Sequence, residues 1–261
     1  MNNKEDKTVP YQVWESCLKM ISPPSSEKTV WKIPEGNRLG LLIIEFRSHP
    51  WFLHVLNNIA HIYGGTDVSL YVVHGINNEI FVKHVLKKWS NVVFIKLEHY
   101  NIDRGQYAEL CCDPDIYRRF DTEFILKFEV DTISRHKIPD VFFQYSYVGA
   151  PWTGYPNDYP DNPHIKVGNK LVGNGGYSLR NVKRMIDICQ SNPKPPKLGE
   201  DVHITNCLDE TEIPPVNLAK EFSVEWVYHE NPCALHQCWR FHSLDKIVEW
   251  FCGVPGFEFK T

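Results

Sequence analysis

The stretch FILKFEVDTI, from Phe124 to Ile133, begins as an apolar run of strand length and ends in two carboxylates one residue apart, Glu129 and Asp131. Alternation along an extended chain puts both carboxylates on the same side as the chain leaves the sheet. Two such acids repel each other unless a cation or hydrogen-bond donors separate their charges. The stretch therefore predicts a buried strand with an acidic pair at its carboxyl end.

The acidic pair has a functional and a structural interpretation. Hard divalent ions such as Mg²⁺ and Mn²⁺ prefer oxygen ligands and often bridge one or two carboxylates to a diphosphate. Asp131 and Glu129 are therefore candidate ligands of such an ion. The structural alternative is an exposed strand end or a helix cap, because Asp131 followed by Thr132 would cap a helix well.

Three other apolar runs of strand length precede this strand, and helical segments alternate with them. The runs are GLLIIEF (residues 40–46), VSLYVVHG (68–75) and NVVFIKLE (91–98). The helical segments cover about residues 50–63, 77–89 and 103–120, where Pro114 begins a new helix or breaks the old one. Apolar strands that alternate with helices indicate an α/β doubly wound fold, with a mostly parallel central sheet and helices on both faces.

Doubly wound folds bind ligands outside the carboxyl ends of their strands. Glu45 and Arg47 follow the first apolar run, and the acidic pair follows the fourth. Arg47 could contact a base or a phosphate through its planar guanidinium, or it could form a surface ion pair. We expect these residues to lie together at the carboxyl-end edge of the sheet, where a ligand would bind.

The chain divides into an arm and one domain. Residues 1–35 are polar and contain prolines, and we expect a peripheral arm with a short helix over about 11–20. We expect residues 36–261 to form a single domain, whose first half (36–135) would bind a nucleotide and whose second half (136–261) would face an acceptor. In the second half, the patterns predict a strand entering a glycine turn (170–181), helices over 181–190, 200–209 and 243–252, and a late strand over 222–230.

Composition and charge exclude some classes of protein. The 261 residues carry a formal charge of -4 and contain no long basic run, which argues against a nucleic-acid partner. The N-terminus is polar, and the apolar runs are far shorter than the roughly 20 residues that span a bilayer. We expect a cytoplasmic protein with no membrane span, whose eight cysteines are mostly reduced thiols.

The segment LVGNGGYSLRN contains three glycines in four positions. The adjacent Gly175 and Gly176 allow positive φ and close approach of a ligand to the backbone, and a β-bulge or a tight turn is the alternative. The segment matches neither G-x-G-x-x-G nor the P-loop. It favours a ligand the size of a sugar or a nucleotide.

The segment GEDVHITNCL begins a predicted helix with Glu200 and Asp201. Acids in a first turn stabilise a helix through its dipole by roughly 0.3–1 kcal/mol, which is the structural explanation. The functional explanation makes one of them a general base within reach of an acceptor hydroxyl.

His236 lies in HENPCALHQCWRFH, a segment rich in histidine and cysteine. Its spacing matches no zinc finger, in which two close pairs are separated by a longer insert. A neutral His236 could instead complete the coordination of a metal held by Asp131, although a single histidine is often structural.

The order of these segments resembles the GT-A class of glycosyltransferases. The E-V-D triplet looks like a variant of the D-x-D metal motif of that class. GNGGYSLR resembles the glycine-rich acceptor-side segment of β-galactosyltransferase-like enzymes, and EDV resembles their helix that bears the catalytic acid. EFRSHPWFLHVLNNI is loosely similar to the F-R-x-R segment that contacts the nucleotide.

A closer resemblance is to a family of uncharacterised domains found in large-genome viruses, algae and bacteria. It rests on the E-V-D triplet, YVGAPW (147–152), VGNGGYSLR (172–180) and EDV (200–202), in this order, and covers about residues 41–239. The first acid of the metal motif is Glu129 where the class has Asp. Asp131 is therefore the firmer ligand, and Glu129 could hold the metal, bind a ribose hydroxyl or be structural.

The resemblance implies a metal-dependent glycosyltransferase that transfers a sugar from a nucleotide-diphosphate donor, a UDP sugar, to a glycan or other hydroxyl acceptor with inversion. Mn²⁺ or Mg²⁺ would be held by Asp131, Glu129 and His236. Asp201 would be the base, and Glu200 would orient the acceptor. Trp152 would stack on a sugar, and the proline- and aromatic-rich loop after it would form a lid. The donor would contact Arg47, Glu45, Glu129, Asn174, Gly175 and Gly176.

Two other classes stay open. A nucleotide-sugar nucleotidyltransferase also uses acidic pairs on a doubly wound sheet, but it should carry a glycine-rich basic segment after the first strand, where EFRSHPW has no glycine. A catalytically inactive glycan- or nucleotide-binding module would be compatible with the unusual Glu129. For a viral member of the family, the expected location is the host cytoplasm or the virion.

Overall fold

The central sheet has six strands, and the four from the first half of the chain are parallel. A computed structural model describes residues 8–152 and 171–258. In spatial order the strands are β3 (Val92–Lys96), β2 (Ser69–His74), β1 (Asn37–Ile44), β4 (Thr122–Phe128), β7 (Tyr177–Asn181) and β6 (Tyr147–Val148). β7 runs antiparallel to both β4 and β6. The predicted mixed α/β fold with a mostly parallel sheet is confirmed.

The strand order reverses between β1 and β4, because β2 and β3 lie on one side of β1 and β4 lies on the other. Ile43 pairs with Phe128, so the two strands end at nearly the same level. In doubly wound sheets a ligand crevice opens at such a reversal, beyond the carboxyl ends of the strands. Glu45 and Glu129 are the first acids after these two ends.

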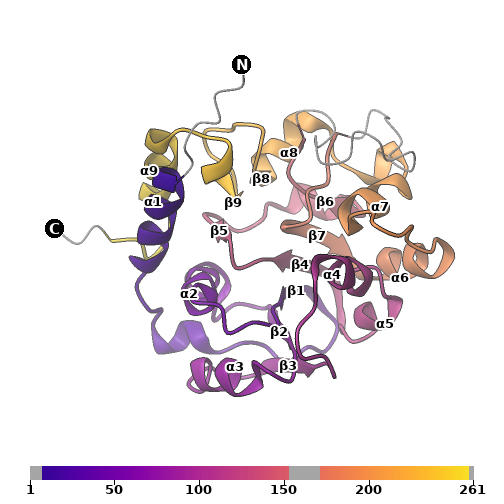
Figure 1. Cartoon of the computed structure of the whole chain (residues 1–261), viewed down its shortest axis with the longest axis horizontal. Helices are drawn as coiled ribbons and strands as arrows, with labels where there is room; N and C mark the ends of the chain where they lie inside the picture. The colour runs from indigo at the N-terminus through magenta and orange to yellow at the C-terminus, as the bar shows by residue number, and fades with distance from the viewer. Residues whose placement is uncertain (1–7, 153–170, 259–261) are drawn as a thin grey trace.

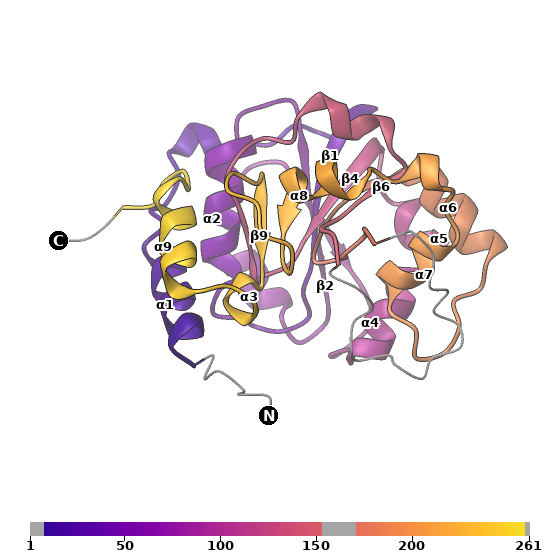
Figure 2. The ribbon, with the colours of Figure 1, turned by 90° about the horizontal axis from the view of Figure 1, so that it is seen from above.

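Helices cover both faces of the sheet (Figure 1, Figure 2). Successive side chains of β1 alternate between the faces, with Leu41 and Ile43 packing on one side and Leu42 and Ile44 on the other. The first face is covered by α1 (Thr8–Lys19), α2 (Phe52–Tyr63), α3 (Glu79–Val85) and α9 (Leu244–Cys252), and the second by α4 (Arg104–Leu110), α5 (Pro114–Tyr117), α6 (Val182–Ser191) and α7 (Glu200–Asn206). Because both faces are covered, the strands are largely apolar and could be recognised as continuous runs.

The α1 helix belongs to the same hydrophobic core as the sheet. Trp14 and Leu18 are fully buried. The ring of Trp14 lies 4.8 Å from that of Trp239 and 5.2 Å from that of Phe251 in α9, measured between centroids. Figure 1 shows α1 and α9 side by side at one end of the molecule. α1 therefore joins the start of the described chain to its last helix.

A second, smaller sheet lies beyond the carboxyl end of β4. It is formed by β5 (Thr132–Ser134), β9 (Ala234–His236) and β8 (Ser223–Val224), in the order β5-β9-β8. The late strand predicted over residues 222–230 is wrong in extent, because only two residues form β8, and β9 was not predicted. The strand expected to enter the glycine turn instead follows it as β7, and Val172 before the turn makes only an isolated bridge to Pro151.

The remaining elements are short. They are α8 (Val216–Phe222) and four 3-10 helices, η1 (Ser26–Thr29), η2 (Asp140–Gln144), η3 (Glu210–Glu212) and η4 (Cys238–Arg240). Across residues 8–152 and 171–258, every helix is too short or too polar to cross a bilayer.

Candidate functional site

A cavity of about 850 Å³ opens beyond the carboxyl end of β4. Four separate segments form its inner wall: the chain after β4, the glycine turn before β7, the start of α7 and the end of β9. Their side chains and backbone in the wall include Glu129, Gly175, Gly176, Glu200, Asp201 and His236. The structure thus brings together residues that the sequence singled out one by one.

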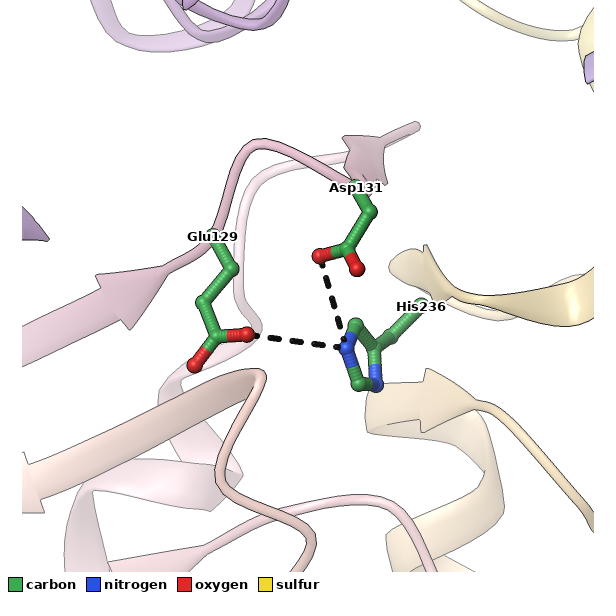
Figure 3. Close-up of side chains that lie close together, drawn as sticks. All are labelled: Glu129, Asp131 and His236. Carbon is green, nitrogen blue, oxygen red and sulfur yellow. Dashed lines mark ion pairs between the residues drawn. The ribbon is translucent and has the colours of Figure 1, made fainter. Parts of the chain in front are cut away.

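Glu129, Asp131 and His236 form a group that could hold a metal ion (Figure 3). The Nε2 atom of His236 lies 3.6 Å from Asp131 Oδ1 and 3.9 Å from Glu129 Oε2. The pairing of β5 with β9 creates this geometry, because it sets Thr132 opposite His236 and so brings the histidine beside the preceding aspartate.

The donor atoms of this group fit a divalent cation. Asp131 Oδ1 and His236 Nε2 are buried without a hydrogen-bond partner in the described structure, and each faces the other. Two ligands that each lie ~2.1 Å from one ion are separated by roughly 3 to 4 Å. The two distances from His236 fall in this range, and all three ligand atoms lie within 4.8 Å of one another. Gln237 holds the second oxygen of Asp131 by donating a 2.7 Å hydrogen bond from its Nε2 to Oδ2.

Lys127 neutralises Glu129 from inside the sheet. Its side chain is 1% exposed, and its Nζ donates to Glu129 Oε1 at 2.6 Å and to the carbonyl of Gly175 at 2.9 Å. Tyr107 donates to the same carboxylate oxygen at 3.0 Å, so Oε2 is left to face His236. Burial alone would raise the pKa of Glu129, but the charges of Lys127 and His236 outweigh it and lower that pKa to about 2. Glu129 is therefore an anion at neutral pH.

His236 is held from its other side by Glu225, whose Oε1 lies 3.2 Å from the Nδ1 atom. Burial lowers the pKa of His236, but the carboxylates of Asp131 and Glu225 outweigh it and raise that pKa well above its usual value. Glu225 is not among the residues predicted from the sequence. Its only signal was an acidic residue within the apolar segment FSVEW, which resembles the signal of Lys127 in FILKF.

Asp201 lies in the first turn of α7, on the same cavity. Burial and the neighbouring charge of Glu200 raise the pKa of Asp201 to about 7, although hydrogen bonds from two backbone N–H groups oppose the shift. These donors are Val202, at 2.8 Å, and Gly175, at 3.2 Å. A carboxylate with a pKa near neutrality is suited to general-base chemistry.

Glu200 points into a buried cationic pair instead of outward to solvent. Its Oε1 lies 3.5 Å from Arg180 Nη2 and 3.7 Å from Lys127 Nζ, and both cationic side chains are 1% exposed. Lys127 therefore lies between Glu129 of the metal-capable group and Glu200 beside the candidate base. One buried cation connects the two acidic parts of the site.

The turn requires glycine mainly because neighbouring side chains leave no room for a Cβ, and less because of the backbone angle φ. Among its glycines only Gly173 has a positive φ, 144°. A Cβ on Gly176 would lie 2.2 Å from His236 Nε2, and a Cβ on Gly175 would lie 2.6 Å from Glu200 Oε1. The expectation that Gly175 and Gly176 use positive φ is therefore wrong. Side chains of the protein itself approach these glycines closely, and the close approach of a ligand stays a prediction.

Asn174 and Trp152 also line the cavity. Asn174 donates from Nδ2 to Glu225 Oε2 at 2.6 Å and accepts the N–H of Gly176 at 2.9 Å. Trp152 is 8% exposed and packs against Leu198 and Val202. The loop expected to act as a lid covers residues 153–170, which lie outside the described part of the chain.

Arg47 and Glu45 lie at the end of β1 but outside the wall of this cavity. The guanidinium of Arg47 binds Glu45 through two hydrogen bonds of 2.8 Å each. The hydrogen bond to Glu45 raises the pKa of Arg47, and the carboxylates of Asp131 and Glu129 add to the shift. The charge of Arg47 therefore interacts with the carboxylates of the metal-capable group. Its contact with a donor stays a prediction.

Comparisons with known proteins give a family but no activity. The model of a family described as "Protein of unknown function (DUF5672)" matches residues 91–236. Two solved structures of S. aureus TarS 1-349 are similar to the chain, one alone (14% identity, TM-score 0.45) and one in complex with UDP (13%, 0.44). They cover 65% and 64% of this chain, which spans only about half (54%) of each of them. No curated protein matches the chain.

Proposed function

The chain belongs to the family described as "Protein of unknown function (DUF5672)", and we propose from the geometry of its cavity that it is a metal-dependent glycosyltransferase. It would transfer a sugar from a nucleotide-diphosphate donor, a UDP sugar in the simplest case, to a hydroxyl acceptor. One observation carries the proposal: Glu129 and His236 of the metal-capable group line the same cavity beyond the sheet as the candidate base Asp201.

Glu129, Asp131 and His236 would hold the ion, which we expect to be Mn²⁺ or Mg²⁺. When bound there, a divalent ion supplies positive charge that stabilises the diphosphate leaving group. The cavity wall adds cationic side chains of its own for the phosphates, namely Arg104, Lys194, Lys197 and Arg240. Arg47 and Glu45, at the reversal of strand order, would contact the nucleotide.

Asp201 would act as the general base. Its carboxylate takes the proton from the acceptor hydroxyl while the hydroxyl oxygen forms a bond to the anomeric carbon of the donor sugar. The bond from that carbon to the diphosphate breaks, and the electron pair leaves with the nucleoside diphosphate. A single displacement of this kind inverts the anomeric configuration. The pKa of about 7 leaves Asp201 half ionised near neutral pH, where a base is most effective.

The other residues of the wall would position the two sugars. Asn174, Gly175 and Gly176 present a surface with little side-chain bulk against which the donor sugar could lie. Trp152 would stack on an acceptor sugar, because this residue lines the same wall as Asp201. Glu200 would orient the acceptor indirectly, since its carboxylate is held by Arg180 and Lys127.

Donor hydrolysis and donor binding test this proposal. The full chain should cleave a UDP sugar in the presence of Mn²⁺ and lose that activity in EDTA, whereas an inactive binding module would bind UDP without cleaving the donor.

We expect Asp131→Asn to abolish metal-dependent UDP binding in calorimetry, because the buried Oδ1 no longer carries charge. Asp140→Asn is the matched control, since Asp140 is 87% exposed and pairs with Arg38. Unchanged Mn²⁺-dependent affinity in Asp131→Asn would refute the ligand assignment.

A further inference from the structure

A carboxylate with no expected role lies directly behind the proposed metal ligand His236. Glu225 follows β8 and is 4% exposed, and its two oxygens have different partners. Oε1 lies 3.2 Å from His236 Nδ1, and Oε2 accepts a 2.6 Å hydrogen bond from Asn174 Nδ2. Asn174 therefore holds one oxygen of the carboxylate by a hydrogen bond, and the other oxygen lies at ion-pair distance from the ring.

We infer that Glu225 is a positioning residue that orients His236 for metal binding, an inference that rests on the proposed metal-dependent function. A carboxylate at Nδ1 keeps the proton on that nitrogen, so Nε2 is the ring nitrogen that would release its proton and bind a metal. The Nε2 atom is the one that faces Asp131 Oδ1 and Glu129 Oε2. Glu225 thus favours the ring direction in which Nε2 faces the other two ligands.

The same carboxylate connects the metal ligand to the glycine turn. Asn174, which donates to Glu225, accepts the N–H of Gly176 through its Oδ1 at 2.9 Å. Gly176 in turn packs so closely on the His236 ring that a Cβ would lie within 2.5 Å of three ring atoms. Asn174, Glu225 and His236 are each less than 9% exposed. The wall proposed for the donor sugar and the metal ligand therefore form one buried unit.

Manganese binding measures this role without requiring activity. Mn²⁺ should be titrated into the full chain, without donor, and the free ion followed by electron paramagnetic resonance. We expect Glu225→Gln to weaken Mn²⁺ binding roughly 10- to 100-fold, as other partners of metal-ligating histidines do. Glu212→Gln is the control for loss of a partly buried, hydrogen-bonded glutamate, because Glu212 binds Arg184 and lies outside the cavity wall. Its Mn²⁺ affinity should equal that of the wild type.

A double-mutant cycle separates positioning from a general structural role. If Glu225 acts through the imidazole, Glu225→Gln should cause no further loss of Mn²⁺ affinity in a His236→Ala background. An equal further loss in that background would overturn the inference. Should Glu225→Gln fail to fold, Glu225→Asp retracts the carboxylate by one methylene and is expected to weaken Mn²⁺ binding. Wild-type affinity in a folded variant of either kind would overturn the inference.

The outcomes distinguish this inference from the function on which it rests. If the wild type binds Mn²⁺ and Glu225→Gln binds it equally well, the positioning role is overturned and the metal site stands. If the wild type does not bind Mn²⁺, the metal site and the positioning role are both overturned.

Discussion

At the scale of single residues, the site depends on how burial and neighbouring charges tune its acids in opposite directions. Glu129 has a pKa lowered to about 2 because Lys127 and His236 outweigh the effect of burial. Asp201 has a pKa raised to about 7 because burial and Glu200 prevail over two backbone hydrogen bonds. One acid thus stays ionised for a cation while the other can exchange a proton near neutral pH, which is the division that acid–base chemistry requires.

The raised pKa of Asp201 predicts the pH dependence of transfer. Only the ionised carboxylate accepts a proton, so kcat/KM should be low at pH 5.5, rise through about pH 7 and level off above pH 8. Initial rates over this range test it, with Mn²⁺ occupancy checked by electron paramagnetic resonance at each pH. Asp201→Asn should retain Mn²⁺ and UDP binding and lose transfer at every pH. Normal turnover in this variant would remove Asp201 as the base.

The site residues that could be predicted from the sequence are those that belong to a short pattern of neighbouring residues. Glu129 and Asp131 end an apolar run, Glu200 and Asp201 begin a helix, and all are recognisable within ten residues. Glu225 could not be found in this way, because its partner Asn174 is 51 positions away and its role exists only in the folded contact. The cause of the glycine turn was also hidden, since a histidine from β9 supplies the steric limit.

At the scale of elements, prediction succeeded where a strand or helix is long enough to show a period. The runs of β1, β2, β3 and β4 are five to eight residues long, and all but the edge strand β3 are mostly buried, so their apolar character marks them. β5 and β9 have three residues each and β8 has two, which is too few for any periodic pattern. These short strands are nevertheless the ones that bring His236 and Glu225 to the site.

The burial of α1 predicts that this helix contributes to global stability. Trp14 is fully buried between Trp239 and Phe251, so we expect Trp14→Ala to lower the free energy of unfolding by about 3–5 kcal/mol. Val9→Ala in the same helix is the control, because Val9 is 51% exposed and should cost less than about 0.5 kcal/mol. Urea denaturation followed by tryptophan fluorescence and circular dichroism measures both. Equal stability of the two variants would show that α1 packs loosely in solution.

At the scale of the whole molecule, the proposed ligands should stabilise the fold only in combination. The metal-capable group joins β4, β5 and β9, so an ion and a diphosphate bound there would connect the central sheet to the small sheet. A ligand at 100 times its dissociation constant adds about 2.7 kcal/mol to the free energy of unfolding, which in a chain of this size raises Tm by roughly 5–10 °C. We expect this rise with UDP and Mn²⁺ together in differential scanning fluorimetry, and little or none with UDP in EDTA. His236→Ala should lose the Mn²⁺-dependent part of the shift, while Asp140→Asn should keep it. An equal shift with UDP in EDTA would mean that the nucleotide binds without an ion, and the metal-dependent reaction would then have no basis in this cavity.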